Sequence, residues 1–512
     1  MGISNFFKTK VNERENYFKK YSYRIVNESA LSQKRKVSVV VPVYNAKEYL
    51  RKTVDSVIQQ NLGFHEITLI LVDDLSNDGS QSILKEYARI YENIVVVYLE
   101  ENTGTPAFPR NLGVELSNAE TVTFLDADDW LSRTALKTLY DLLVESNVNY
   151  VVGKTIQEEK DKQKIIGRYE SFEKRKKVSP FSIPHIFYHL GPRARMMNLN
   201  FIKDNDIRFP EMKFAEDKQF FIDVYTQCGL ISTTSEPIYH LNRIENNDSL
   251  TKRTNIMEKT DTNISVLKYV LDKKLEIEKE KMIVNRLVEF DLMTRMFERN
   301  HFIKSKDKQE YYKKFKQAIS LLKKRPYDIS ETFFKPIHKI GYKLLLQSKF
   351  DEVATLYTWS KNNNEKEILI EDKKAQYITK LNPLEEVKIE IPLYAELQTE
   401  SVQEDKYMAK ILLFGYETNS VSHLEFQSRN DATKSYLVPV KLSENSCEIE
   451  LPLEKLRQFE NGGYVMYLLY NEYERVTIIK KSNEKFELID SQQIYTLYQT
   501  IKGNLSIKVN NT

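Results

Sequence analysis

The spacing of apolar residues changes along the chain, and its first regular stretch begins at residue 37. Three apolar runs, Val37–Pro42, Ile67–Val72 and Ile94–Leu99, have the length of buried strands. Each is followed by a segment whose apolar residues recur every three or four positions, as in a helix. The run Thr121–Leu125 adds a fourth strand. Alternating strands and helices predict a largely parallel sheet with right-handed crossovers.

After residue 150 the pattern changes twice. Residues 150–250 are mixed and rich in loops, and residues 260–375 are mostly helical and strongly charged. From about residue 380, apolar and polar positions alternate between turn residues, which predicts an antiparallel β-sandwich. The predicted strands of the sandwich are Val387–Leu397, Lys410–Tyr416, Ser435–Leu442, Cys447–Leu453, Tyr464–Tyr470 and Val476–Lys480.

We therefore predict an α/β protein in four parts. Residues 37–258 form a domain with a Rossmann-like, mostly parallel sheet, residues 259–377 a helical linker, and residues 378–512 an immunoglobulin-like antiparallel sandwich. Residues 1–36 are a basic extension with apolar residues near one helical face. Such a segment can lie on an anionic membrane surface or pack on its own domain, and the sequence leaves both open.

The composition narrows the class of protein. The 512 residues carry a net charge of +3, so the chain as a whole gives no argument for a nucleic-acid partner. Cys228 and Cys447 are far apart and predict neither a disulfide framework nor a zinc site. No apolar run has the length of a signal peptide or of a membrane-spanning helix. We expect a cytoplasmic protein that contacts a membrane at most peripherally.

The candidate chemistry lies where the predicted parallel strands end. Asp126 and Asp128 follow the fourth strand and are two positions apart, so both side chains lie on one side of an extended segment. Carboxylates this close favour a divalent cation such as Mg²⁺ or Mn²⁺, bound together with a phosphorylated substrate. A solvated acidic turn is the simpler explanation of an isolated DxDD sequence. Ligands of parallel sheets bind at the carboxyl ends of the strands, where further polar residues gather.

Four motifs at successive strand ends, Val41–Asn45, Leu71–Asp74, Asn102–Asn111 and Asp126–Asp129, resemble those of family 2 glycosyltransferases of the GT-A fold. The resemblance covers about residues 37–250. It implies roles for six nucleotide-site residues and one metal ligand. Pro42 and Tyr44 would lie near the base, Asp74 would accept from the uracil N–H, Asn102 and Arg110 would hold the nucleotide and its sugar diphosphate, Asp126 would hold the ribose, and Asp128 would hold the diphosphate-bound Mn²⁺ or Mg²⁺.

A second acidic pair, Glu216-Asp217, matches the position at which this family carries its catalytic base. The resemblance makes Asp217 the base, and Glu216 would orient either the acceptor or the metal shell. An inverting transfer needs one carboxylate to take the proton of the attacking hydroxyl. A helix start favours the ionised carboxylate that a base requires, although a simple helix cap is the alternative explanation.

A closer resemblance is to bacterial wall teichoic acid poly(ribitol-phosphate) glycosyltransferases. It rests on Lys203–Pro210 before Ala215–Asp217, on the Tyr239–Ser249 segment and, more loosely, on Ser428–Val440. It implies transfer of GlcNAc or glucose from UDP-GlcNAc or UDP-glucose to an anionic poly(ribitol-phosphate) acceptor. The basic residues that flank the base suit such an acceptor because arginine pairs with phosphate in a forked geometry. Arg195, Arg208 and Arg243 are the candidates for acceptor binding.

The sequence departs from these relatives in two ways. It has room for one sandwich domain where some relatives carry two, and Asn246, Asn247 and Asp248 stand where many relatives have a histidine. A third protein ligand for the metal is therefore in doubt, and His240, which can also be structural, is the substitute. The resemblance further implies a homotrimer formed through the sandwich.

Two alternatives remain open. A glycosyltransferase of capsular or exopolysaccharide synthesis would have the same catalytic domain and a different acceptor. A non-catalytic glycan-binding scaffold would use the sandwich as a lectin-like module, but Asp126, Asp128 and Asp217 would then serve no purpose. Residue types do not distinguish ribitol-phosphate from glycerol-phosphate acceptors, nor one UDP-sugar from another.

Overall fold

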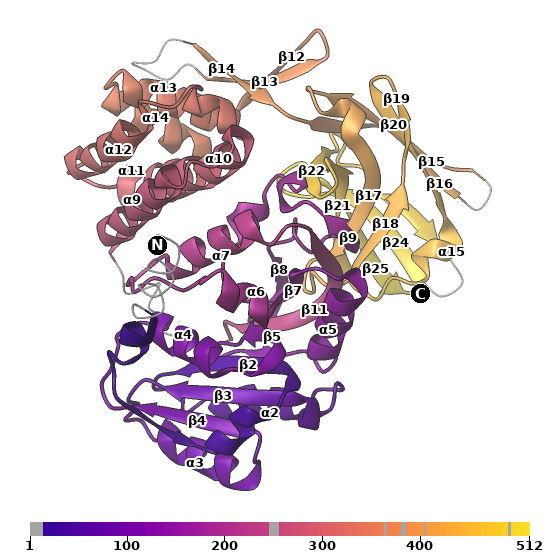
Figure 1. Ribbon diagram of the computed structural model, residues 1–512. Helices are drawn as coiled ribbons and strands as arrows, with labels where there is room; N and C mark the ends of the chain where they lie inside the picture. The colour runs from indigo at the N-terminus through magenta and orange to yellow at the C-terminus, as the bar shows by residue number, and fades with distance from the viewer. Residues whose placement is uncertain (1–13, 245–254, 363–365, 380–385, 404–405, 490–492) are drawn as a thin grey trace. The chain divides into compact units, whose positions relative to one another are not determined.

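The computed structural model describes residues 14–244, 255–362, 366–379, 386–403, 406–489 and 493–512. The chain divides into two compact units, which we describe separately (Figure 1). Unit 1 comprises residues 1–160 and 165–283, and unit 2 comprises residues 161–164 and 284–512. No helix in the described parts of the chain is long and apolar enough to cross a membrane.

Four parallel strands form the first half of the sheet in unit 1. They are β2 (Arg35–Val43), β3 (Ile67–Asp73), β4 (Ile94–Leu99) and β5 (Ala119–Phe124), in the order β4-β3-β2-β5. Nearly all their residues are buried, as expected of strands covered on both faces. The helices that follow them are α2 (Leu50–Ile58), α3 (Ser80–Ile90), α4 (Ala107–Leu116) and α5 (Ala135–Ser146). The predicted alternation of strands and helices is confirmed.

The second half of the sheet has mixed strand directions. β10 (Arg195–Asn198) runs antiparallel between β5 and β7 (Tyr150–Glu158), and β11 (Ile231–Asn242) runs parallel to β7. β6 (Trp130–Leu131) forms the edge beside β11. The shorter elements are β8 (Gln163–Ile166), β9 (Arg175–Val178) and α6 (Leu199–Asp204). This half begins directly after the DxDD sequence, so that sequence lies at the change between the two halves.

The basic segment before the sheet packs on unit 1 as far as it is described. β1 (Tyr23–Val26) pairs antiparallel with β4. Tyr17 and Tyr21 place their rings against Phe108 of α4, with centroids 5.5 and 4.6 Å apart. Of the two options that the sequence left open, the described part of the segment shows packing on its own domain. The boundary predicted at residue 37 falls inside β2.

Helix α7 (Glu216–Gln227) is braced by α9 (Ile256–Asp272), which belongs to unit 1 and is followed by α10 (Ile277–Val284). The buried Lys218 ammonium bonds to Asn263, and Asp223 accepts from Tyr269 Oη at 2.6 Å. These contacts hold the helix that begins with the Glu216-Asp217 pair. The boundary predicted between residues 258 and 259 falls inside α9.

The helical part of unit 2 opens with a π-helix, η5 (Asn285–Phe297). The sequence suggests one apolar stripe here, but the polar residues Asn285, Glu289 and Asp291 are buried as well. Glu289 accepts from the backbone N–H groups of Phe334 and Lys335 at 2.8 and 2.7 Å. The helices that follow are α11 (Asn300–Ile303), α12 (Gln309–Leu322), α13 (Pro336–Leu346) and α14 (Phe350–Lys361).

The rest of unit 2 is built from strands. β12 (Glu367–Glu371), β13 (Lys374–Thr379) and β14 (Val387–Ile391) form an antiparallel sheet, so the last part of the predicted linker is a hairpin. The larger sheet contains β15 (Tyr394–Gln403), β16 (Lys406–Phe414), β17 (Val421–Ser428), β18 (Ser435–Pro439), β19 (Lys441–Ser443), β20 (Ser446–Pro452), β21 (Gly462–Tyr470), β22 (Glu474–Ile479), β23 (Phe486–Ile489), β24 (Gln493–Gln499) and β25 (Leu505–Asn511). Its pairings are antiparallel except that of β15 with β22. Residues of β16 and β20 share one core with residues of β17 and β21. The predicted C-terminal antiparallel fold is confirmed.

Candidate active site

The carboxyl ends of the four parallel strands bring the predicted nucleotide residues to one edge of the sheet. Tyr44 lies just beyond β2 and is 55% exposed, which leaves its ring available for a flat base. Asp73 ends β3 and Asp74 follows it, and Asp126 comes shortly after β5. Parallel register fixes this arrangement, because Val43 of β2 lies opposite Asp73 of β3. The sequence prediction of a common edge is confirmed.

Asp74 is held by the loop that follows β4. Its carboxylate accepts from Thr103 N at 2.8 Å and from Thr103 Oγ1 at 3.0 Å. Asn102 Nδ2 donates to the Asp74 carbonyl at 2.7 Å. Burial raises the pKa of Asp74, and the bonds from Thr103 oppose that shift. The two predicted nucleotide residues Asp74 and Asn102 thus form one unit, in which the amide fixes the position of the acid.

Pro42 and the turn after β2 form the part of the sheet edge that carries Tyr44. Pro42 is half-buried and pairs in register with Val72 of β3. Asn45 adopts φ 49°, and its backbone N–H donates to Ser76 Oγ at 3.0 Å. Its side-chain oxygen accepts from Asn77 N at 2.9 Å. Cross-loop bonds of this kind hold the turn that carries Tyr44 against the turn after β3.

Asp129 is the structural member of the DxDD sequence, and sequence reasoning missed its partners. It is buried, and its carboxylate accepts from Tyr239 Oη and from Asn242 N, both at 2.7 Å. Burial, followed by the nearby Asp128 and Asp126 carboxylates, raises the pKa of Asp129. These bonds anchor the turn to β11 and leave Asp126 and Asp128 half-buried at the edge of the sheet.

Arg110 connects the two acidic motifs. Its guanidinium donates to Asp126 Oδ1 at 2.8 Å and to Glu216 Oε1 at 3.2 Å. The Arg110 side chain is only 6% exposed, so these charge-assisted bonds are shielded from solvent. Residues 106 positions apart in sequence, Arg110 and Glu216, therefore meet in one site. The predicted nucleotide residues and the predicted catalytic pair are brought together.

The acidic pair begins helix α7, as the sequence predicted. Ala215 before it adopts φ 72°, a left-handed conformation that residues with a side chain rarely take. Glu216 is largely buried, and desolvation together with the adjacent Asp217 raises its pKa to about 7, against the opposing effect of Arg110. Asp217 is half-buried and lies close enough to Arg110 to interact with it electrostatically. Two neighbouring carboxylates thus differ in environment, which is the arrangement that separates a binding role from a proton-transfer role.

Asp126 and Asp128 could hold a divalent cation only together with oxygen atoms supplied by a bound ligand. Among the residues that the structure describes, no three histidine, cysteine, aspartate or glutamate side chains cluster as a metal site. Asp126 gives one oxygen to Arg110, which leaves Asp128 as the main candidate. Magnesium in nucleotide sites is commonly held by one or two carboxylates plus phosphate oxygens and water, and the donor set here suits that pattern.

His240 is not available as the substitute metal ligand. Its Nδ1 lies 2.7 Å from Glu158 Oε1, and its Nε2 lies 2.9 Å from Ser132 Oγ. The ring also stacks on Trp130 with centroids 5.4 Å apart. Both nitrogens are therefore engaged in holding β11 and its neighbours. The segment with Asn246, Asn247 and Asp248 lies outside the described residues.

The prediction that Arg195 binds the acceptor is wrong, because its side chain has no exposed surface. Its guanidinium pairs with the buried Glu170 carboxylate at 3.0 Å and donates to the Arg193 carbonyl at 2.7 Å. Glu170 also bonds to His189, so the three form an internal polar cluster. A polymer cannot reach a side chain that is enclosed in this way.

The other two predicted acceptor residues are reachable. Arg208 is partly exposed, pairs with Asp206 at 2.7 Å, and lies over the ring of Tyr17 at 5.2 Å. Arg243 is half-buried and donates to the carbonyl of Asn242 at 2.7 Å. Neither contact joins these residues to Asp217 or Glu216. Their role in acceptor binding stays a prediction.

Comparison with known proteins finds glycosyltransferases. Residues 38–205 match the family model described as Glycosyl transferase family 2. A poly(ribitol-phosphate) beta-glucosyltransferase of Bacillus spizizenii is 31% identical over 209 residues, which are 40% of this chain and 32% of that protein. The poly(ribitol-phosphate) beta-N-acetylglucosaminyltransferase TarS of Staphylococcus aureus is 31% identical over 209 residues, 40% of this chain and 35% of that protein. The chain thus spans about a third of the length of these relatives.

A putative teichuronic acid biosynthesis glycosyltransferase of Bacillus subtilis, TuaG, is 43% identical over 109 residues, 21% of this chain and 42% of that protein. The crystal structure of S. aureus TarS matches 93% of this chain and 85% of that chain, with a TM-score of 0.58 and 20% identity. A shorter TarS chain in complex with UDP-GlcNAc matches 69% of this chain and 99% of that chain, with a TM-score of 0.57 and 22% identity. These structural matches show that the fold is shared.

Proposed function

We propose that this chain, which belongs through residues 38–205 to the family 2 glycosyltransferases, transfers GlcNAc or glucose from a UDP-sugar to ribitol-phosphate units of wall teichoic acid, with inversion. One observation carries the proposal. Arg110 bonds to Asp126 of the nucleotide edge and to Glu216 of the acidic pair, so donor and acceptor groups share one site. The poly(ribitol-phosphate) relatives and the UDP-GlcNAc complex of TarS supply the donor and acceptor classes.

The donor lies along the strand ends in this proposal. Tyr44 packs on the base, and Asp74, held by Asn102 and Thr103, accepts from the uracil N–H. Asp126 binds the ribose while Arg110 keeps its carboxylate in place. Arg110 also adds positive charge where the diphosphate develops negative charge as the sugar bond breaks. Fixed donors and charges of this kind lower the barrier because they need no rearrangement during the reaction.

A divalent cation, Mn²⁺ or Mg²⁺, held by Asp128 and the diphosphate oxygens would neutralise the charge of the leaving UDP. The residues of this chain fit that requirement through Asp128 and, with its free oxygen, Asp126. Asp129 has a supporting part, because its bonds to Tyr239 and Asn242 keep Asp128 at the edge of the sheet. We therefore propose a metal-dependent donor site.

The acceptor reaction falls to the acidic pair. Asp217 takes the proton of the ribitol hydroxyl as its oxygen attacks the anomeric carbon from the face opposite the diphosphate. Glu216, bonded to Arg110, holds the start of α7 in register with the nucleotide edge. The brace between Lys218 and Asn263 fixes the same helix from its other side. Asp217 is then the carboxylate that accepts the proton, because Arg110 engages its neighbour Glu216.

The proposal is tested by offering UDP-GlcNAc and UDP-glucose with purified poly(ribitol-phosphate) and following UDP release and polymer mass by mass spectrometry. We expect UDP release that depends on polymer and a mass increase of one hexose or N-acetylhexosamine per modified unit. Chelator should stop transfer, and Mn²⁺ or Mg²⁺ should restore it. UDP release without any mass change of the polymer would contradict the acceptor assignment.

A second acceptor class, a capsular or exopolysaccharide, is favoured by one observation. Arg195 does not face solvent, which removes one expected phosphate contact. Raised salt separates the two classes, because bulk ions weaken binding of a polyanion much more than binding of a neutral glycan. Equal salt dependence of the KM for donor and acceptor would support the polysaccharide.

The proposal also includes a homotrimer formed through residues 378–512, with catalysis at a cytoplasmic membrane surface. The described part of this region leaves several large side chains exposed, among them Tyr416 at 54% and Leu437 at 46%. Two other tyrosines of the region, Tyr464 and Tyr473, are instead buried in the core. Light scattering on the full chain gives the oligomeric state directly, and a monomer would contradict this part of the proposal.

A further inference from the structure

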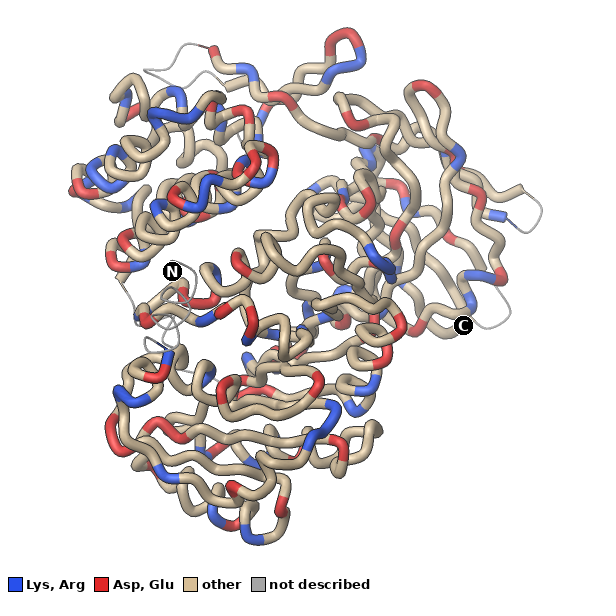
Figure 2. Tube along the Cα trace, in the orientation of Figure 1, with Lys and Arg blue, Asp and Glu red and all other residues tan. Residues whose placement is uncertain are grey.

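The helices of unit 2 hold a concentration of positive charge that the active site does not use. Residues 304–325 contain two acidic residues, Asp307 and Glu310, in a chain whose total charge is +3. The basic residues of the same stretch are Lys304, Lys306, Lys308, Lys313, Lys314, Lys316, Lys323, Lys324 and Arg325. Figure 2 shows basic residues along these helices. The charge of the chain is therefore uneven, and this region, like residues 1–36, is strongly basic.

Most of these lysines extend into solvent without a carboxylate partner. The exposed ones are Lys304, Lys306, Lys313, Lys316, Lys323 and Lys324. None of the six forms an ion pair with any residue that the structure describes. Surface lysines elsewhere do so, for example Lys137 with Asp141 and Lys434 with Glu460, both at 2.5 Å. An unneutralised set of like charges raises the local concentration of anions.

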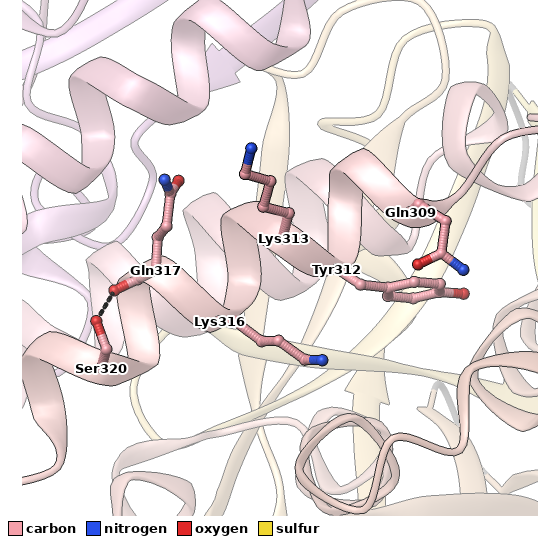
Figure 3. A pocket seen from close by; sticks show the side chains of 6 residues that line it. All are labelled: Gln309, Tyr312, Lys313, Lys316, Gln317 and Ser320. Carbon is pink, nitrogen blue, oxygen red and sulfur yellow. Dashed lines mark hydrogen bonds between the residues drawn. The ribbon is translucent and has the colours of Figure 1, made fainter.

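A groove of about 430 Å³ runs along α12 in the middle of this basic region. It is lined by Gln309, Tyr312, Lys313, Lys316, Gln317 and Ser320. Figure 3 shows Lys313 and Gln317 on one side of the helix face and Lys316 and Tyr312 on the other. The floor is firm, because Tyr312 stacks on Phe350 with centroids 3.7 Å apart and donates to the Phe350 carbonyl. We call this surface the α12 groove.

The side chains that line the α12 groove suit a ligand that carries both phosphodiester and hydroxyl groups. The ammonium groups of Lys313 and Lys316 suit phosphate oxygens. The amides of Gln309 and Gln317 both donate and accept, as hydroxyl groups require, and Ser320 adds a hydroxyl. Lysines next to neutral amides on one face match a polymer that alternates phosphate and polyol.

A membrane surface fits the α12 groove less well. Helices that lie in a membrane interface insert apolar side chains between the lipids. Most apolar residues of α12, including Phe315, Ile319 and Leu322, are packed inside unit 2, and Leu321 is half-buried. The exposed face offers charge and hydrogen bonds and nothing to insert. A flexible anionic chain in water is the better match.

We propose that the α12 groove and its flanking lysines bind the polyol-phosphate acceptor away from the reacting unit. The inference rests on the proposed function and adds a second contact region for the same polymer. Helix α12 has 14 residues and is about 21 Å long. Lysines continue beyond both ends, at Lys304 and Lys306 and at Lys323 and Lys324. Several successive phosphates can thus be held at once, which raises the local concentration of further hydroxyls for the active site.

The test is the double reversal Lys313→Glu with Lys316→Glu in the full chain. Binding of fluorescently labelled poly(ribitol-phosphate) should weaken about ten-fold or more at low salt, because two attractive charges become repulsive. The KM for long polymer should rise in parallel. The KM for UDP-sugar, kcat on a short acceptor and the melting temperature should change less than about two-fold or 2 °C, since both side chains are exposed.

The matched control is Lys85→Glu with Lys502→Glu, which changes the net charge equally on exposed lysines of α3 and of the turn before β25. Polymer binding should stay within about two-fold of the wild type, because general electrostatics are the same. Equal weakening in both variants would overturn the inference. So would unchanged polymer binding combined with lost binding to phosphatidylglycerol vesicles, which would assign the groove to a membrane.

Failure of the proposed function has a different signature. If the wild type binds the polymer but never glycosylates it, the acceptor assignment of the active site is wrong while the binding measurement still tests the α12 groove. If the wild type glycosylates the polymer and the reversal variant matches it at every salt concentration, the α12 groove is wrong and the proposed function stands.

Discussion

The two halves of the sheet in unit 1 place charged residues differently. In the parallel half, Asp74 and Asp126 lie just after strand ends at one edge of the sheet, where Asp126 is half-buried and Asp74 is buried and held by Thr103. In the mixed half, Arg195 and His240 are satisfied by partners inside the protein, Glu170 for one and Glu158 with Ser132 for the other. From the sequence alone, the residues of both halves are equally good candidates for a functional site.

The difference shows what topology contributes. Parallel strands end at one edge, so a polar residue at a strand end reaches the ligand side without any detailed knowledge of packing. A charge within antiparallel strands and loops has no such fixed destination. Its role depends on which partner the fold supplies. Four predictions test this contrast, from the largest expected effect to the smallest.

Asp217→Asn should lower kcat by about 10²- to 10⁴-fold, because the side chain can no longer accept a proton. The KM for UDP-sugar should stay within a few-fold, since the donor contacts are made by other residues. Steady-state kinetics with saturating polymer measure both. A variant that keeps most of its turnover would remove Asp217 as the base and turn attention to Glu216.

Arg195→Met should lower the free energy of unfolding by about 3–5 kcal/mol, because it leaves the Glu170 carboxylate buried without its cation. Urea unfolding measures the loss. The double variant with Glu170→Gln should recover part of it. If Arg195→Met instead keeps its stability and weakens polymer binding, the side chain reaches the acceptor after all.

Glu216→Gln should change how stability depends on pH. The pKa of Glu216 is about 7 in the folded protein and ordinarily 4.5, so the folded state binds the proton more tightly in between. The contribution of this group is therefore fully present below about pH 4.5 and is lost as the pH rises through about 7. Melting temperatures from pH 4.5 to 7.5 should fall less steeply in the variant. An identical slope would show that Arg110 keeps Glu216 ionised throughout.

Arg208→Ala should cost less than about 1 kcal/mol of stability, because its partner Asp206 is exposed and remains hydrated. Arg208 would be assigned to polymer binding only if Arg208→Ala raised the KM for the acceptor in assays run beside Arg195→Met. Comparable unfolding curves for the two variants would show that burial does not separate these arginines.

Much of the donor edge could be predicted from sequence, and much of the acceptor side could not. Periodicity gives the strands, strand ends give Asp74, Asn102 and Asp126, and the family resemblance adds Arg110, which lies in α4. The bridge from Arg110 to Glu216 and the link from Asp129 to Tyr239 join residues about a hundred positions apart, and no local pattern contains them. The third acid of DxDD was a signal for a buried anchor, since three exposed carboxylates in four positions would repel one another.

The helical linker shows the same limit in another form. Apolar residues recur at α-helical spacing here, at Ile283, Leu287, Phe290, Met293 and Phe297, but residues 285–297 form the π-helix η5, in which polar residues are buried as well. Its wider turn changes which residues share a face, so the α-helical period does not describe it. The hairpin of β12 and β13 was missed because its strands are short and β12 is largely exposed.

Strand β1 has a consequence for the solubility of the protein. β4 is made of six buried residues, Ile94–Leu99, and its outer side carries a full row of backbone groups able to recruit another chain. β1 pairs with four of these residues, Val96 to Leu99. A chain shortened to begin at residue 37, where the sequence pattern suggests a domain start, would lack β1. The valine-rich strand β4 would then have an unpaired edge that other chains could pair with. Its solubility on expression, compared with that of the full chain, would show whether the first strand acts as a shield against self-association.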